Sequence, residues 1–546
     1  MSALTTQTPI IETATDVVTK KIYIEERELA GETKLLQFSV NKTFNKISSA
    51  KLVFQDGSVS EQDFVLSNDD RFKPGNKIKI QIGFHGIVET KFVGIIIRHS
   101  IKVCQNGTSL LSLEAKDTAI KLTTARKSAY YINKSDKEII EGIATSLNPV
   151  VDPILELHPQ LVQFDATDWD FILTRAEANG MLVFCDDGNL FVKRPSTLSF
   201  PVLTAMYGKN IQEFEAEMDA RNQFKEIRST SWDYTKQQPE NSDPGQSDFI
   251  ENGNFNSDNL GKVLGSIINL KHPGHLKKPQ LQSWSDAVAM RNKLSRAVGR
   301  VRIKGNAVVK PGTVISLSGV GDRFSGNVFV TGVLQHYEGS WQTDIQFGWN
   351  DDWFYKKEDV MDKPASGLLP GVNGLLIGKV NDVDDQEQGG QYRVKVHIPT
   401  ITTGDAGIWA RVATLDAGEN RGSYFRPQKG DEVVLGFLSD DPREAIILGY
   451  LHSKDQKKSP LPLEDGKLQS GFVTKEGTKL IFDDSSKRIT LLVPGANGEK
   501  SITINNDSSA IELKDDFNNS IIMDANGITI KSDVNVTIKG KFVKIN

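Results

Sequence analysis

Cysteine is almost absent from this sequence, in which Cys104 and Cys185 are the only two among 546 residues. They lie far apart, and neither has a cysteine or histidine beside it at the spacing of metal ligands. The sequence therefore indicates neither a disulfide framework nor a zinc ribbon. We expect two buried free thiols.

Long apolar runs and an excess of charge are missing as well. No stretch of about 18 apolar residues occurs, and the N-terminus lacks a basic start and an apolar segment of export length. We therefore expect synthesis in the cytoplasm without a signal peptide. The 65 basic and 70 acidic residues leave a formal charge of -5, which favours neither nucleic acid nor an anionic membrane as main partner.

Motifs of catalysis are also absent, since the sequence has no G-x-x-x-x-G-K-[ST] loop, G-x-S-x-G elbow or H-E-x-x-H helix. His272 and His275 form H-P-G-H, but Pro-Gly forces a turn and no third ligand follows at a suitable distance. Three acidic pairs are expected in turns where Asp caps the backbone: Asp440 with Asp441, Asp483 with Asp484, and Asp515 with Asp516. We expect no enzyme, no metal site and no cofactor.

The most specific stretch runs from Ile408 to His452. A strand at Trp409–Val412 is followed by a long polar loop, the alternating strand Glu432–Leu438 and the apolar strand Ala445–Leu451, which predicts a small β-barrel. The ordered string W-x-R-V, F-x-P-x-x-G-D-E-V-x-L-x-F, D-P and I-I-x-G resembles the OB-type barrel of the VgrG family. Members of that family are the central spikes of contractile injection machines.

The first 350 residues contain a repeated skeleton of turn glycines and alternating strands. Lys73-Pro74-Gly75 leads into one strand and then to Phe92–Ile96, and Lys310-Pro311-Gly312 leads into another and then to Val330–Leu334. Agreement at both ends of the two segments predicts a duplicated β-barrel.

A more helical segment separates the two copies. Ser135 to Glu138 has the spacing of a capping box, and a second helix is expected from Thr167 to about Gly180. The string from Val162 to Met181 again resembles VgrG hub domains. A third helix is expected at about Ser285–Val298, before the strands of the second barrel.

The run from Thr235 to Asn259 is rich in Asn, Asp, Ser and Pro. It has too few apolar residues to order itself by burial, and we expect a mobile surface loop there.

The tail repeats short strands with two or three apolar residues each, separated by polar turns at nearly equal steps. One such β-solenoid would bury little and would leave open strand edges, so we predict an intertwined trimeric β-prism. Its expected core is Ile502, Ile504, Ile511, Leu513, Ile521, Met523, Ile528, Ile530, Val534, Val536 and Ile538. Its blunt end is expected to seat a separate tip protein on Phe542, Val543, Ile545 and Asn546.

The predicted fold class is mainly β: two tube-like barrels with a few helices, an OB-type barrel and a trimeric β-helix or β-prism. The predicted domains are an N-terminal arm (1–22), hub barrel 1 (23–130), a mixed insert (131–204), hub barrel 2 (205–355), a linker (356–374), the OB-type barrel (375–453), a connector (454–466) and the spike (467–546).

The resemblance to VgrG proteins implies a homotrimeric hub and spike of a type VI secretion system or an extracellular phage-tail-like particle. It implies that a sixfold inner tube is adapted to a threefold needle, which helps to puncture the target envelope. The partners it implies are a hexameric inner tube protein, baseplate proteins, a small PAAR-like tip protein and toxin cargo, with a membrane met only on firing.

Two other classes stay open on the sequence. A carbohydrate-binding or carbohydrate-degrading solenoid would need clustered aromatic residues in a groove, and the tail has only Phe472, Phe482, Phe517 and Phe542. An OB-fold nucleic-acid-binding protein would need a basic face. The barrel loop with Arg421, Tyr424, Phe425 and Arg426 fits that need in part, but it fits bracing of a neighbouring subunit equally.

Overall fold

The computed structural model divides the chain into two compact units, Met1–Asp362 and Lys363–Asn546. The residues that it describes are 17–29, 31, 33–105, 109–233, 236–272, 276–349, 364–367, 370–385, 390, 392–401, 407–453, 459–461, 468–508 and 510–545. None of the helices in these ranges is long and apolar enough to cross a membrane.

The first unit opens with a repeat of strands, called here the first repeat (residues 18–116). Its elements are β1 (Val18–Ile24), β2 (Arg27–Glu28), β3 (Leu35–Thr43), β4 (Ser49–Gln55), α1 (Val65–Asn68), the 3-10 turn η1 (Asp70–Phe72), β5 (Lys77–Phe84), β6 (Ile87–Val103) and β7 (Ser109–Lys116).

A second repeat (residues 203–347) closes the same unit. Its elements are β13 (Leu203–Met206), β14 (Ile211–Glu217), β15 (Glu226–Asp233), β16 (Gln238–Asn241), α4 (Ser257–Leu264), β17 (Ile267–His272), α5 (Lys278–Ser295), β18 (Val298–Lys304), β19 (Val314–Ser318), β20 (Gly326–Glu338) and β21 (Ser340–Phe347).

The two repeats have the same strand order. Apart from the short β2 and the separate sheet of β15, β16 and β17, the first reads β1-β5-β6-β7-β4-β3 and the second reads β13-β19-β20-β21-β18-β14. Each therefore joins its first, fourth, fifth, sixth, third and second strands in that sequence. One pairing differs, because β1 runs antiparallel to β5 whereas β13 runs parallel to β19. The shared order supports the predicted duplication.

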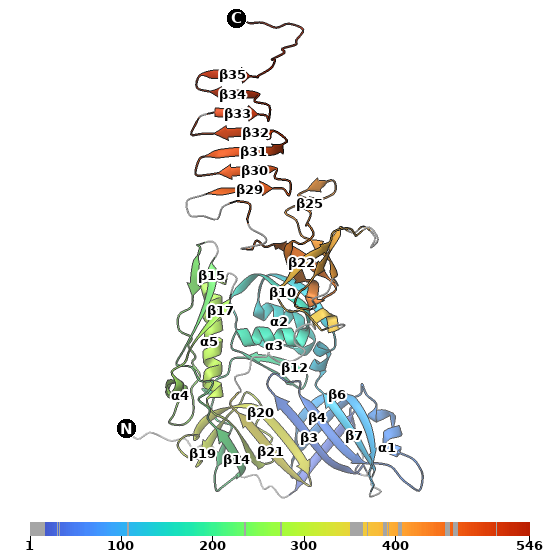
Figure 1. The fold of residues 1–546 in the computed structure, drawn as a ribbon. Helices are drawn as coiled ribbons and strands as arrows, with labels where there is room; N and C mark the ends of the chain where they lie inside the picture. Colours follow the sequence, from blue (N-terminus) through green and yellow to red (C-terminus); the bar gives the residue numbers. More distant parts are fainter. Residues whose placement is uncertain are drawn as a thin grey trace, which may run out of the picture. The chain divides into compact units, whose positions relative to one another are not determined.

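The repeats are not two separate barrels. The second half of β20 pairs with β3, from Gly332 opposite Thr43 to Tyr337 opposite Phe38, so one 13-stranded sheet runs through both (Figure 1). Each repeat keeps its own hydrophobic core, one built around Phe54 and Phe92 and the other around Val301 and Phe347. We call the β20–β3 contact the internal seam.

The Lys-Pro-Gly turns occupy equivalent places. Gly75 N–H donates to Ile96 O and Gly312 N–H donates to Val330 O, each at 2.8 Å. Both glycines have positive φ, +102° and +88°, which glycine adopts without steric cost. The sequence match at the other end of the two segments was wrong. Ile96 is equivalent to Val330, whereas Gly94 precedes Ile96 and Gly332 follows Val330, so these two glycines are not equivalent.

Between the repeats lies an insert with its own core around Ile172 and Val183. Its elements are η2 (Thr118–Thr123), β8 (Arg126–Ser135), α2 (Asp136–Ile143), η3 (Thr145–Leu147), β9 (Val150–Val151), β10 (Leu157–Thr167), α3 (Asp168–Ala178), β11 (Leu182–Asp186) and β12 (Asn189–Lys193). The predicted capping box is present at Ser135 and Glu138, and Thr167 caps α3.

The polar run that was expected to be a mobile loop has defined structure in its described part. It contains β16 and leads into α4, and Gly245 N–H donates to Ile227 O at 2.8 Å. The buried Arg296 donates to Phe255 O at 3.0 Å and to Asn252 Oδ1 at 2.6 Å. Polar contacts therefore order the run where apolar burial could not. The third helix, α5, begins at Lys278, seven residues before the predicted start at Ser285, and packs along β15 (Figure 1).

The second unit begins with η5 (Pro364–Gly367) and a closed five-stranded barrel, β22-β23-β24-β28-β27. Its elements are β22 (Leu376–Asp382), β23 (Arg393–His397), β24 (Ile408–Val412), β25 (Ala417–Gly418), β26 (Arg421–Gly422), β27 (Glu432–Phe437), η7 (Leu438–Asp440) and β28 (Ala445–Tyr450). The barrel spans the predicted range closely, and Val396, Ala410, Leu435 and Ile447 fill its interior.

The rest of this unit is a meander of seven antiparallel strands (Figure 1). They are β29 (Gln469–Val473), β30 (Lys479–Asp483), β31 (Arg488–Gly495), β32 (Gly498–Asn505), β33 (Ala510–Lys514), β34 (Ser520–Asp524) and β35 (Gly527–Lys531). Within its described residues a single chain thus forms one flat layer and does not coil into a solenoid. A prism would need further copies.

Some predicted boundaries change. β1 starts at Val18, inside the predicted N-terminal arm, and the first repeat ends at Lys116, earlier than the predicted boundary at 130. Most of the predicted linker and connector lies outside the described residues.

Candidate assembly surface of the C-terminal sheet

The meander carries two apolar rows on one face, each running across all or nearly all of its strands. Directly paired residues form the first row, which is Phe472, Leu480, Leu491, Ile502, Leu513, Ile521 and Ile530. The second row is Phe482, Ile489, Ile504, Ile511, Met523 and Ile528. Because side chains alternate along a strand, both rows project from the same face.

These rows are open to solvent in the single chain. Leu513 is 37% exposed and Ile528 is 68% exposed, and most other members lie between these values. A groove of about 770 Å³ runs against this face, lined by Leu491, Ile502, Leu513, Ile530 and the following Val534 and Val536. A contiguous apolar surface of this extent is typical of a protein interface.

The structure brings together most of the predicted core residues. Ile502 through Ile530 lie in the two rows, whereas Val534, Val536 and Ile538 follow β35 outside any assigned strand. The prediction missed the first half of the rows, from Phe472 to Leu491, although I-x-L-x-V at Ile489–Val493 alternates just as clearly.

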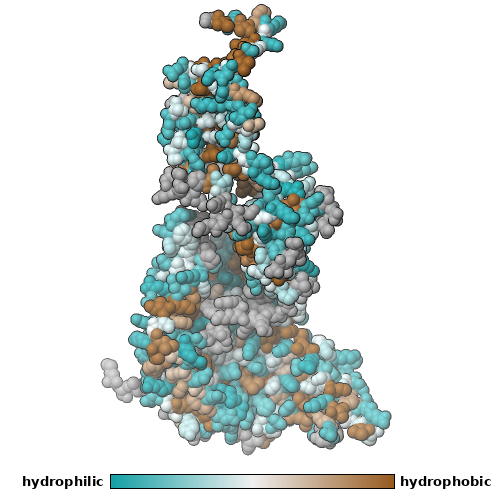
Figure 2. Space-filling view, viewed as in Figure 1, coloured by the Kyte–Doolittle hydropathy of each residue, from teal (hydrophilic) through white to brown (hydrophobic). Residues whose placement is uncertain are grey.

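The predicted tip-docking residues lie on the segment after β35. Phe542, Val543 and Ile545 are 84%, 50% and 87% exposed, and Figure 2 shows hydrophobic residues gathered on that segment. Asn546 lies outside the described residues.

The three acidic pairs occupy turns between strands, as predicted. Asp441 accepts from Arg443 N–H at 2.9 Å, and Asp483 accepts from Ser485 N–H at 3.1 Å. Asp515 accepts from the N–H groups of Phe517 and Asn519, each at 2.9 Å. These hydrogen bonds lower the pKa of Asp515, with the Asn519 side chain as the main cause. Asp441, Asp483 and Asp515 thus cap backbone groups in these turns.

The barrel loop with its aromatic and basic residues has partners within its own unit. Arg421 pairs with Asp416 at 2.7 Å, and Arg426 donates to Val383 O. The Phe425 ring stacks on Phe472 of β29, with 5.3 Å between ring centres. Tyr424 is 70% exposed. The loop therefore contacts the first strand of the meander in its own chain. The contact expected from the sequence was with a neighbouring subunit.

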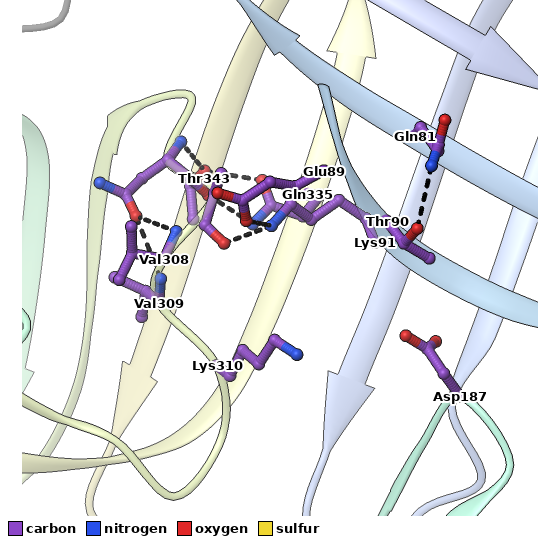
Figure 3. Close-up of polar contacts among 12 residues, drawn as sticks. Gln81, Glu89, Thr90, Lys91, Asp187, Val308, Val309, Lys310, Gln335 and Thr343 are labelled. Atoms are coloured by element: carbon purple, nitrogen blue, oxygen red, sulfur yellow. Dashed lines mark hydrogen bonds and ion pairs between the residues drawn. The ribbon is translucent and has the colours of Figure 1, made fainter. Parts of the chain in front are cut away.

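At the internal seam, an acidic turn binds two lysines, and a third lysine lies nearby (Figure 3). Asp186 and Asp187, at the β11–β12 turn, bind Lys42 of β3, and Asp186 also binds Lys310 at 3.0 Å. Lys91 reaches from β6 to Glu89 at 3.0 Å and to Ala307 O (Figure 3). Burial lowers the pKa of Lys91. Burial alone would raise the pKa of Asp186, but Lys42 and Lys310 hold it below its usual value.

A second buried polar cluster lies in the insert. Asp136, at the start of α2, accepts from Arg175 Nε at 2.7 Å, from Asn179 at 2.7 Å and from His158 Nε2 at 3.1 Å. Burial works against the carboxylate, but His158 and Arg175 hold the pKa of Asp136 well below its usual range. Three cationic or amide donors around one carboxylate form a structural cluster.

Cys185 is buried and free, and burial raises the pKa of its thiol. Cys104 is also free but only half-buried, which corrects the expectation of two buried thiols. His272 ends β17, and its predicted partner His275 lies outside the described residues. Within the described part of the chain, no group of three or more His, Cys, Asp or Glu side chains is arranged to hold a metal ion.

Two family models match this chain. One, described as the Alg8 N-terminal domain, matches residues 14–338. The other, described as the type VI secretion system/phage-baseplate injector OB domain, matches residues 376–452, which is the range of the closed barrel.

Similar proteins include VgrG1c, a type VI secretion system spike protein of Pseudomonas aeruginosa, 32% identical over 154 residues, or 26% of this chain and 21% of that protein. VgrG3, a type VI secretion system spike protein of Vibrio cholerae, is 32% identical over 127 residues, or 21% of this chain and 12% of that protein. The match thus spans about a fifth of these relatives or less. A tail protein from Neisseria meningitidis aligns with a TM-score of 0.45 and 15% identity over 62% of this chain and 98% of its own.

Proposed function

The chain belongs to the Alg8 N-terminal domain family and is a VgrG-like spike, and on that premise we propose that it is the structural hub and spike of a contractile injection machine. In this proposal it is a homotrimer at the tip of the machine, joins a sixfold inner tube to a threefold needle and helps to puncture the target envelope. The machine is a type VI secretion system or an extracellular phage-tail-like particle.

The observation that carries the proposal is the pair of apolar rows on the C-terminal sheet. A one-layer meander with half-exposed Ile, Leu and Met side chains on one face gains little by staying alone in water. Three such faces turned toward one axis would bury the rows against one another. The resulting prism would be stiff, as a needle driven by an outer sheath needs to be.

The duplication supports the proposed match to a sixfold inner tube. Each chain supplies two units of the same strand order, so three chains supply six similar units. A ring of six such units would match a hexameric inner tube, while the C-terminal sheets keep threefold symmetry.

The remaining partners follow from the same role. Baseplate proteins would surround the hub, a small PAAR-like protein would sit on the end near Phe542, Val543 and Ile545, and toxin cargo would travel with the tip. We assign the chain a structural role and no catalytic one. It would be made in the cytoplasm and carried out only on contraction.

A matched pair of variants in one strand tests the proposal. Ile502→Asn puts a polar amide in an apolar row, whereas Thr503→Asn changes the next residue on the opposite face of β32. We expect the first to lose the trimer or its resistance to mild denaturant, because each copy loses about 2–3 kcal/mol of apolar burial. The second should sediment as the unchanged protein. Equal behaviour of both variants would contradict the proposed trimer core.

A further inference from the structure

The internal seam provides a template for a second seam, because each of its two strands has a counterpart in the other repeat. β20 pairs with β19 through its first half and with β3 through its second half. β6, the counterpart of β20, pairs with β5 through Ile87–Ile95 in the same way. Beyond Ile95 its only partner among the described strands is β7.

The correspondence between β6 and β20 is fixed residue by residue. The Lys-Pro-Gly contacts equate Ile96 with Val330. Both strands then carry a register shift against the sixth strand at the same place, between Ile96 and Arg98 and between Val330 and Gly332. Val103 is therefore the counterpart of Tyr337.

β14 is the counterpart of β3. Phe38 lies opposite Leu52 of β4, and Phe214 lies opposite Val301 of β18, so the two phenylalanines are equivalent. β3 is covered by β20, whereas β14 ends the sheet, with β18 as its only partner among the described strands. The free edge of β14 and the free half of β6 are thus the two counterparts of the internal seam.

We propose that β6 of one chain pairs antiparallel with β14 of a second copy of this chain, in the register of the internal seam. That register places Val103 opposite Phe214, Lys102 opposite Glu215 and Ile101 opposite Ala216. The inference rests on the proposed function for its oligomer and adds the strands, their register and the charges that select it.

The side chains of the two edges agree with this register. On one face Val103 and Ile101 meet Phe214 and Ala216, which reproduces the internal stack of Tyr337 on Phe38, 5.5 Å apart. Val103 and Ile101 are 68% and 50% exposed in the single chain. Burial of these side chains would favour the pairing.

On the other face the charges are opposite. β14 presents Glu213, Glu215 and Glu217, and β6 presents Arg98 and Lys102, all of them exposed. A slip by one residue would set Lys102 against Phe214 or Ala216 and would turn every side chain to the wrong face. The pattern therefore excludes slips by one residue, and the register of the internal seam selects among the alignments that remain.

The second seam would lack the ion pairs that Asp186 and Asp187 form with Lys42 and Lys310 at the first. The counterpart of Lys42 is Met218, and Lys73, the counterpart of Lys310, pairs with the exposed Asp70. Among the described residues, no acidic turn is held there by one buried and one half-buried lysine, as Lys42 and Lys310 hold Asp186. The internal seam would thus form as the chain folds, and the second seam would form between folded chains and close the ring without a free edge.

Disulfide trapping in the full-length chain tests the register. In a Cys104→Ser background, Lys102→Cys combined with Glu215→Cys places two thiols directly across the proposed seam. Lys102→Cys with Glu217→Cys is the pair slipped by two residues. Ser39→Cys with His336→Cys lies across the internal seam and should close within each chain.

We expect covalent trimers on a non-reducing gel from the Lys102 and Glu215 pair, and none from the slipped pair. Light scattering on the same samples separates the possible failures. A trimer without cross-links, or one cross-linked by the slipped pair, would overturn the seam or its register and leave the proposed function standing. A monomer without cross-links would overturn both.

Discussion

Two clusters of buried charge in the first unit hold together segments that are distant in the chain. Asp136 joins β8 and α2 to α3 through Arg175 and Asn179, and to β10 through His158. Its carboxylate is buried and surrounded by donors, so it contributes stability only in its ionised form.

The pH dependence of this contribution has a definite sign. The pKa of Asp136 is lowered in the folded chain, so the stability is present above the unfolded value of about 4 and is lost as pH falls below it. We expect Asp136→Asn to cost about 2–3 kcal/mol at pH 6. The difference from the unchanged protein should shrink between pH 5 and pH 3. Denaturant unfolding at several pH values measures it, and a constant difference would contradict this account.

At the residue scale, features that depend on neighbouring residues could be predicted from the sequence. The capping box at Ser135, the cap at Thr167 and the acidic turns all depend on neighbours within a few residues, and all were predicted. The contacts of Asp136 with His158 and Arg175 span 22 and 39 residues. No local pattern in the sequence indicates contacts over such separations, and these contacts were not predicted.

At the scale of elements, the acidic β11–β12 turn holds the two repeats in register. Asp186 contacts Lys42 from the first repeat and Lys310 from the second. A two-residue turn of the insert thereby joins three segments of the fold. Removing one partner of a buried ion pair leaves a charge without compensation, which is costly.

The duplication supplies a matched control for this turn. Asp186→Ala together with Asp187→Ala should lower the unfolding free energy of the first unit by about 2–4 kcal/mol, because the buried Lys42 then loses both of its acidic partners. Lys73→Ala removes the counterpart of Lys310, whose ion pair is exposed, and should change stability by less than about 1 kcal/mol. Thermal or denaturant unfolding compares the two. Equal losses of unfolding free energy would argue against a stabilising role for the ion pairs of the acidic turn.

Repeats and barrel were predicted from strand periodicity and turn glycines, but their pairing was not. The match of Gly94 with Gly332 failed because the two hairpins differ in both strand and loop length. The first repeat pairs eight residues of β5 with β6 across a short turn, whereas the second pairs four residues of β19 with β20 across a longer loop. The joining of both repeats into one sheet depends on β20 meeting β3, nearly 300 residues apart. The order of the polar run likewise depends on Arg296, far along the chain.

At the scale of the whole molecule, each of the two units leaves a surface that a further copy of the chain would cover. In the second unit these are the apolar rows, and in the first they are the edges of β6 and β14. Alternation in the tail sequence predicted the rows. The edges could be recognised only once the strand order was known.

The mass of the full-length protein in solution tests the central claim most directly. We predict a trimer of three times the chain mass of 60.4 kDa by light scattering, stable in mild denaturant. A version that ends at Ser453 lacks the apolar rows and should be looser, with a mass that falls on dilution. A full-length protein that is monomeric at micromolar concentration would contradict the account, because the exposed rows would then have no partner of their own kind.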